Sequence, residues 1–198
     1  MRTGTEISRP RGRPRSFDRD TVLRAAGQRF RTHGFAATSL DDLADATGVN
    51  RPSLYAAFGD KRAFYLAALE RTEAWLAESF AGLRQANLPA RKAVERMLRF
   101  SIDTYLSGEQ GPSGCIALNT ATAEAVTDPE IRAALARILA LEDREIEALL
   151  EQGGSPAPRA HAAIVAGVLH SLSIRARAGE SKEKMLAIAM DCAALIPD

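Results

Sequence analysis

Cys115 and His170 are the pair of side chains in this sequence that could do nucleophilic chemistry, because a nearby imidazole activates a thiol. No third residue is placed to orient such a pair. The segment Gly111–Gly114 holds a serine among glycines, as a hydrolase nucleophile elbow does, but its register differs and no strand precedes it. The glycines of this region also lack the Lys-Ser/Thr pair that a phosphate loop requires. We therefore expect no enzymatic activity.

The two cysteines lack the spacing of a structural site. Cys115 and Cys192 lie far apart, outside any C-x-x-C pair or Cys/His set with metal-ligand spacing. We therefore expect no disulfide, no metal and no other cofactor, and a cytoplasmic protein. With 198 residues, 46% of them hydrophobic and 26% charged, the chain has globular composition and no stretch that suggests a membrane span.

Charge is distributed unevenly along the chain. Residues 1–62 hold 12 Lys and Arg against seven Asp and Glu, a net charge of +5, whereas the remainder carries −4. A basic head on a mildly acidic body is the layout expected when one part of a protein meets a polyanion. Genome base composition is an alternative source of the many arginines.

The first 17 residues contain an Arg-Gly-Arg-Pro core within Arg9–Arg15, which resembles an AT-hook. An extended segment of this kind can place Arg11 and Arg13 in a narrow, A·T-rich minor groove, where the negative potential attracts guanidinium groups. The alternative is a solvated basic tail that adds only non-specific attraction.

Helix-forming residues dominate the chain beyond residue 17. Apolar residues recur at three- and four-residue spacing, and no alternating Val/Ile/Thr run indicates a strand. The sequence predicts an all-α fold of nine helices, several of them opened by capping residues such as Asp18, Ser39 and Asn50. The expected helices span about residues 18–33, 40–46, 51–58, 61–86, 90–107, 115–126, 129–152, 159–178 and 182–196.

Two of the short helices have the pattern of a helix-turn-helix unit. Leu40–Ala44 is the supporting helix, Gly48-Val49 is the turn, and Arg51–Phe58 is the helix that would enter a major groove. A reading helix needs a polar outer face and a neighbour that braces it from behind. The positions that would pack the unit together are all apolar: Leu40, Leu43, Ala44, Val49, Leu54 and Phe58.

The stretch Gly34–Leu69 resembles the DNA-binding module of TetR-type, tetracycline-repressor-like, transcriptional regulators. The residues that carry the resemblance are Gly34-Phe35, Thr38-Ser39, Leu43-Ala44, Gly48-Val49, Leu54-Tyr55, Phe58 and Lys61. The segment Gly114–Asn119 also resembles one found in many members. The resemblance implies a homodimer that binds a palindromic operator in double-stranded DNA as a repressor. It divides the chain into a basic tail (1–17), a three-helix head (18–62) and an effector-binding and dimerisation domain (63–198).

The resemblance also implies DNA contacts at two helix starts. Thr38 and Ser39 match positions that meet phosphate at a helix N-terminus, and simple N-capping is the alternative. The reading helix then begins after Asn50 with Arg51, which could bond a guanine edge or a phosphate. The residues after it that fall on the DNA side are Pro52, Ser53, Tyr55 and Lys61.

Two departures from the family pattern weaken parts of this assignment. Ala57 stands where many members carry a backbone-contacting histidine, and Pro52-Ser53 replaces the commoner Gly-Thr pair. The base preference therefore does not transfer. For Tyr55, core packing is the alternative role.

The C-terminal helices should enclose an effector cavity lined from the fourth to the eighth helix. The candidates at inward spacing are Phe64, Leu69, Trp75, Phe80, Met97, Phe100, Ser101, Tyr105, Cys115, Leu118, Asn119, Thr122 and His170. Ordinary core packing is the alternative for each of them. Because few charges fall among them, we expect a small apolar or weakly polar organic effector. Its binding would release the protein from its operator. The alternative input is a thiol-based sensor at Cys115 that responds to oxidants or electrophiles.

The last two helices are the expected dimer interface, since two copies would form a four-helix bundle with an isologous contact. The candidate residues are Ala163, Gly167, His170 and Ile174 on one helix and Met185, Ile188, Cys192 and Leu195 on the other. Burial within the protomer's own domain is the alternative.

Overall fold

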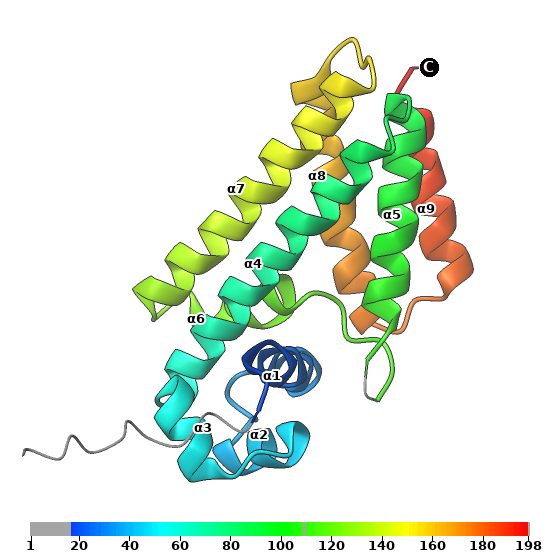
Figure 1. Ribbon diagram of the computed structural model, residues 1–198. Coiled ribbons are helices and arrows are strands. Elements are labelled where there is room, and N and C mark those ends of the chain that lie inside the picture. The colour runs from blue at the N-terminus through cyan, green and yellow to red at the C-terminus, as the bar shows by residue number, and fades with distance from the viewer. Residues whose placement is uncertain (1–16, 109, 198) are drawn as a thin grey trace, which may run out of the picture.

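The computed structural model describes residues 17–108 and 110–197, and within them every regular element is a helix (Figure 1). The predicted all-α fold with nine α-helices is confirmed. The Arg11 and Arg13 assignment lies outside the described residues. The elements are α1 (Arg19–His33), α2 (Leu40–Thr47), α3 (Arg51–Phe58), α4 (Lys61–Gln85), α5 (Ala90–Leu106), the π-helical segment η1 (Ala117–Ala121), α6 (Thr122–Glu124), α7 (Pro129–Gln152), α8 (Pro158–Arg177) and α9 (Lys182–Ala194).

Side-chain caps fix the three helices of the head. The Asp18 carboxylate accepts hydrogen bonds from the Asp20 and Thr21 amides at the start of α1. Ser39 and Asp42 form a reciprocal capping box on α2, and Asn50 accepts from the Ser53 amide on α3. Because each start is held by a cap, short helices that would be marginal alone begin at defined residues.

The helix expected over residues 115–126 is wrong in its first part. The chain there passes through Gly114, and the Cys115 amide donates to the Ser173 hydroxyl of α8 at 2.8 Å. The turn that follows is π-helical, and within it the Thr120 hydroxyl donates to the Ile116 carbonyl and pairs with the buried Tyr65 hydroxyl. Only Thr122–Glu124 is α-helical. Contacts to α4 and α8 therefore override the helix propensity of this segment.

Two hydrophobic cores lie along α4, the long helix that joins the head to the body (Figure 1). The first core combines α1–α3 with the first half of α4, η1 and the start of α7. The second lies among α5, α8, α9 and the end of α7. Phe64, Tyr65 and Leu69 of α4 are fully buried in the first core. The core of the head thus extends past residue 62 and is completed by body helices.

Arginines tie the head to the body at two further points. Arg62 of α4 pairs with Asp128, its Nη2 lying 2.8 Å from Oδ1, and with Glu130 at 3.2 Å. On the other side of the head, Arg177 of α8 donates to the Arg31 carbonyl at 2.7 Å, at the end of α1. The Arg31 side chain in turn donates to the Thr104 and Ser107 carbonyls at the end of α5. These bonds therefore connect the end of α1 to both α5 and α8.

Candidate nucleic-acid interface and cavity

The third helix presents one polar and one apolar face. Leu54 and Phe58 are buried in the head core, and Phe58 stacks on Phe64 with ring centroids 4.3 Å apart. Arg51 and Pro52 are exposed, and Tyr55 is 62% exposed. Core packing therefore does not explain Tyr55. A braced helix with an exposed arginine and tyrosine at its start has the geometry that major-groove entry requires.

Arg51 is positioned by a neighbouring helix. Its Nη1 lies 3.1 Å from a carboxylate oxygen of Asp41, and both side chains are more than half exposed. An ion pair this exposed contributes little to stability, so a phosphate or a base edge can replace Asp41 at small cost. Asn50 and Ser53 are joined by the cap itself, which leaves the Asn50 amide nitrogen on the surface.

The structure separates the two hydroxyls at the start of α2. Thr38 is 1% exposed, and its hydroxyl donates to the Gly34 carbonyl at 2.7 Å. The expected phosphate contact through the Thr38 side chain is therefore wrong, because that side chain fills the base of the loop. Ser39 is exposed, but its hydroxyl donates to the Asp42 carboxylate at 2.6 Å and accepts from the Asp42 amide. N-capping thus accounts for Ser39 in the structure without DNA.

Lys61 lies beside the loop that precedes α2. Its ammonium nitrogen donates to the Phe35 carbonyl at 3.1 Å and sits 4.4 Å from the centre of the Phe35 ring. Both contacts hold the side chain near the start of α4. The residue is partly exposed, so the charge remains accessible from the side of the head that carries α2 and α3.

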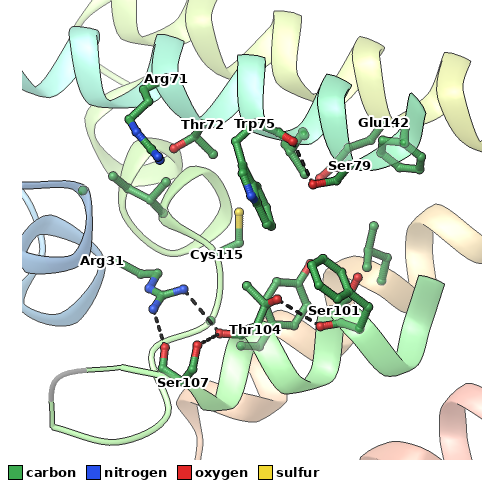
Figure 2. Close-up of a pocket in the computed structure, with 18 of the residues that line it drawn as sticks. Arg31, Arg71, Thr72, Trp75, Ser79, Ser101, Thr104, Ser107, Cys115 and Glu142 are labelled. Carbon is green, nitrogen blue, oxygen red and sulfur yellow. Dashed lines mark hydrogen bonds between the residues drawn. The ribbon is translucent and has the colours of Figure 1, made fainter. Parts of the chain in front are cut away.

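A cavity of about 720 Å³ lies among α1, α4 and α5, where the head meets the body. Figure 2 shows Cys115 near its middle, with Arg31 and Arg71 on one side and Ser101, Ser79 and Glu142 on the other. The predicted lining residues that the structure places on its wall are Trp75, Phe80, Met97, Phe100, Ser101, Tyr105 and Cys115. Trp75 of α4 and Phe100 of α5 face each other with ring centroids 6.1 Å apart.

The remaining predicted lining residues lie elsewhere, each for a visible reason. Phe64 and Leu69 are buried in the head core instead. Asn119 donates to the Ser113 carbonyl at 3.0 Å and so closes its own loop. His170 lies behind the wall, with its Nε2 2.9 Å from the Glu142 carboxylate that does line the cavity. Thr122 is exposed, and Leu118 is partly buried outside the wall.

Helix α1 forms a wall of the cavity that the sequence analysis missed. Its contribution is Leu23, Arg24, Gly27, Gln28 and Arg31, which share one helical face. A glycine inside a helix with basic and polar residues three and four positions away could have pointed to this face. The cavity is therefore in direct contact with a helix of the head.

The expectation of few charges in the wall is also wrong. Arg24, Arg31, Arg71, Arg96 and Glu142 all line the cavity. The error arose because α1 was assigned wholly to the head and because only apolar and weakly polar positions of the following helices were taken as lining, so Arg71 and Arg96 were missed. A weakly polar ligand is thus no longer the simplest occupant.

The Cys115 thiol faces the cavity but has low reactivity as a nucleophile. Burial, together with the nearby Glu142 carboxylate, raises the pKa of this thiol to about 11. Near neutral pH the group is therefore protonated, and the thiol is a poor nucleophile. Tyr105 beside it is likewise held neutral, since burial raises its pKa well above the ordinary value.

The outer face of α8 is apolar and uncovered. Ala163 and Gly167 are exposed, and Ile174 is 60% exposed. On α9, Ile188 is partly exposed, and Leu195, directly after the helix, is 64% exposed. Met185 and Cys192 are buried within the protomer, so their assignment to the dimer contact is wrong. They fill the second core instead.

Among residues 17–108 and 110–197, no cluster of three or more His, Cys, Asp or Glu side chains is arranged to hold a metal ion. No helix in the described part of the chain combines the length and the apolarity needed to cross a membrane.

Comparison with known proteins supports this geometry. A family model described as bacterial regulatory proteins of the tetR family matches residues 22–68. The HTH-type transcriptional repressor ComR of Escherichia coli (strain K12) is 32% identical over 97% of this chain and 95% of its own. The HTH-type transcriptional repressor BdcR of the same strain is 28% identical over 92% and 90%.

A solved structure gives the same result in three dimensions. The TetR family transcriptional regulator CifR, as a cysteine mutant complexed with 26-bp double-strand operator DNA, is similar to this chain with a TM-score of 0.77. Its identity is 28%, and the match covers 93% of this chain and 100% of CifR.

Proposed function

The chain belongs to the tetR family of bacterial regulatory proteins, and we propose that it is a homodimeric repressor released from its operator by a small organic ligand. Its relatives are DNA-binding transcriptional regulators rather than enzymes. The head 18–62 is the DNA-binding part in this proposal, and the body 63–198 binds the effector and the second protomer.

The exposed face of α3 is the observation that carries the proposal. Arg51, Pro52 and Tyr55 project from a helix whose other side is buried in the head core. We assign base or phosphate contact to Arg51 and backbone contact to Tyr55, with Ser53 and Asn50 beside them. Lys61 and the amide end of α2 at Ser39 supply further phosphate contacts. We assign no DNA contact to the Thr38 hydroxyl because that side chain is buried.

Release follows from where the cavity lies. Its wall includes α1, and α1 carries the core against which α2 and α3 pack. A ligand that favours a different position of α1 shifts the population towards heads that no longer fit the operator. That shift can be no larger than the ligand's differential affinity for the two arrangements. No contact between ligand and DNA is needed.

Dimerisation through the outer face of α8 can be tested at one glycine. A side chain added at Gly167 meets nothing within 4 Å in the protomer. Gly167→Arg should therefore fold normally yet fail to dimerise in sedimentation, because the interface would have to bury an arginine. Ala133→Arg, at an exposed position of α7, is the control and should stay dimeric. A dimeric Gly167→Arg would place the interface elsewhere.

Thiol sensing is the weaker alternative for the input. The raised pKa of Cys115 predicts slow alkylation by iodoacetamide near neutral pH. Rapid alkylation that also releases DNA would favour the sensor over the ligand.

Binding to DNA is tested by footprinting the full chain on the region upstream of its own gene. We expect a single protected site with two-fold symmetry and an affinity at least about 10³ times that for unrelated DNA. Affinity for every sequence alike would contradict the proposal.

A further inference from the structure

Glu142 of α7 is a buried acid whose hydrogen bonding is incomplete within the protomer. The residue is 2% exposed and forms part of the cavity wall. Its Oε2 lies 2.9 Å from Nε2 of His170 on α8, and no other hydrogen bond to Glu142 is formed within residues 17–108 and 110–197. An ionised carboxylate can accept about four hydrogen bonds. A buried carboxylate with a single partner therefore has acceptor capacity that a bound molecule can use.

The hydroxyl groups of the wall do not supply the missing donors. Each serine and threonine that lines the cavity donates its hydroxyl hydrogen to a backbone carbonyl three or four residues earlier, and these residues are Thr72, Ser79, Ser101, Thr104 and Ser107. A hydroxyl has one hydrogen to donate and two lone pairs that accept. These groups therefore add further acceptors to the cavity rather than donors.

The arginines of the wall do not serve Glu142 either. They are Arg24, Arg31, Arg71 and Arg96, and none of them bonds to its carboxylate. Arg24 and Arg71 share the Asp20 carboxylate. Arg31 donates to backbone carbonyls at the end of α5, and Arg96 is exposed on that helix. Figure 2 shows Arg31 and Arg71 on the opposite side of Cys115 from Glu142. The acceptor site at Glu142 is thus separate from the arginines of the head end.

We propose that the effector carries an uncharged O–H or N–H group that donates to the Glu142 carboxylate, while its apolar body lies against Trp75 and Phe100. A hydrogen bond to an ionised acceptor is about twice as strong as one between neutral groups, so Glu142 selects molecules that carry a donor. An uncharged donor suits this place because it avoids the desolvation cost of a second buried charge. The two rings, with centroids 6.1 Å apart, supply the apolar surface.

The inference deepens the proposed function and rests on the cavity being the effector site, but its test needs no DNA. Two probes share one skeleton: para-cyclohexylphenol carries an O–H donor, and its methyl ether carries none. Trp75 is the single tryptophan of the chain and lies in the wall, so its fluorescence reports binding in the cavity.

We expect the full chain to bind the phenol about tenfold more tightly than the ether. A cavity that does not recognise the donor would bind the more hydrophobic ether at least as tightly, and that result would overturn the proposal.

Three variants locate the effect. Glu142→Met keeps the length of the side chain but removes the acceptor, so it should weaken phenol binding about tenfold and leave ether binding within about twofold. Glu142→Gln keeps one neutral acceptor oxygen and should lie between Glu142→Met and the wild type. Glu147→Met removes an acid from the same helix outside the wall and should change neither affinity.

A preference for the phenol that persists in Glu142→Met would contradict the proposal, as would equal weakening of both probes. Ether binding that is retained in Glu142→Met shows that the cavity is intact, and circular dichroism of each variant monitors the fold. Either failure leaves footprinting on operator DNA unaffected, so an error about the ligand class is distinguishable from an error about DNA binding.

Discussion

The head of this protein is closely packed, whereas the body borders a cavity that no side chain fills. In the head, Phe30, Leu43 and Leu54 are fully buried in a core with aromatic rings stacked on one another. In the body, α4 and α5 stand apart around a cavity of about 720 Å³, and Phe100 remains 52% exposed. Close packing resists rearrangement of the helices in the head, whereas the cavity leaves the side chains around it with fewer packing partners.

The two regions meet at α1, which belongs to both. One side of α1 carries Val22, Ala26 and Phe30 into the head core, and another side carries Gly27 and Arg31 to the cavity. Under the proposed function, a signal from the cavity to α3 needs no long path, because α1 both lines the cavity and contributes to the core that supports α3.

The largest expected effect comes from opening a hole in the head. Leu54→Ala removes a fully buried side chain and should lower the free energy of unfolding by about 2–5 kcal/mol, measured by urea denaturation. Operator binding should fall with it. Tyr55→Ala, at the exposed neighbouring position, should leave stability within about 0.5 kcal/mol. A small loss in Leu54→Ala would show that the head is not tightly packed.

The packing of the loop that precedes η1 and lines the cavity can be tested by a substitution at Gly114. Gly114 has φ +64°, and an added Cβ would lie 1.9 Å from the Asn119 side-chain nitrogen. Gly114→Ala should cost about 1–3 kcal/mol and displace Cys115. Gly154→Ala has a similar positive φ but no neighbour within 4 Å, so it separates backbone strain from the clash. Equal thermal shifts in the two variants would mean that the Gly114 loop can yield.

Acid should weaken the junction between the two regions. Hydrogen bonds from Arg62 lower the pKa of Asp128 from its ordinary value of 3.8 to about 2. Because the pKa is depressed in the folded state, the stabilisation is complete above the unfolded-state pKa and is lost as the pH falls towards about 2. The stability difference between wild type and Asp128→Asn should shrink over that interval in urea titrations. A difference that is constant with pH would exclude the ion pair as its source.

The smallest expected effect concerns a glycine of the cavity wall. Gly82 lies within α4, and a methyl group there meets nothing within 4 Å. Gly82→Ala should therefore raise the free energy of unfolding by about 0.5–1 kcal/mol, since glycine is a poor helix former. Destabilisation in thermal unfolding would indicate that α4 needs the space for its present position.

The head could be predicted almost completely because its determinants are local. Asp18, Ser39 and Asn50 cap the helix starts that their side chains suggest, and the apolar spacing places Leu43, Leu54 and Phe58 inside. The exposure of Tyr55 and the burial of Thr38 were not decided by spacing. The burial of Thr38 depends on the loop before α2, where its hydroxyl donates to the Gly34 carbonyl.

The cavity could be predicted only in part because it is made of contacts between distant segments. Trp75, Met97 and Phe100 were predicted from inward helical spacing, whereas Arg31 and Arg71 were missed. Their place in the wall depends on the angle at which α1 crosses α4 and α5, which periodicity does not encode. The wrong assignment of Met185 and Cys192 to the dimer interface has a similar cause. Apolar spacing alone does not show whether a helix face packs against its own chain or against a partner.

Whether α3 reads DNA is tested most directly by measuring the affinity of the full chain for its own upstream DNA after the exposed side chains of α3 have been substituted. Fluorescence anisotropy of Arg51→Ala should show a loss of about 1–3 kcal/mol, and adding Tyr55→Ala should weaken binding further, while both variants keep the wild-type unfolding curve. Arg137→Ala, an exposed arginine on α7, is the control for the loss of one positive charge. If the α3 variants bind with wild-type affinity, α3 does not read DNA and the account is wrong.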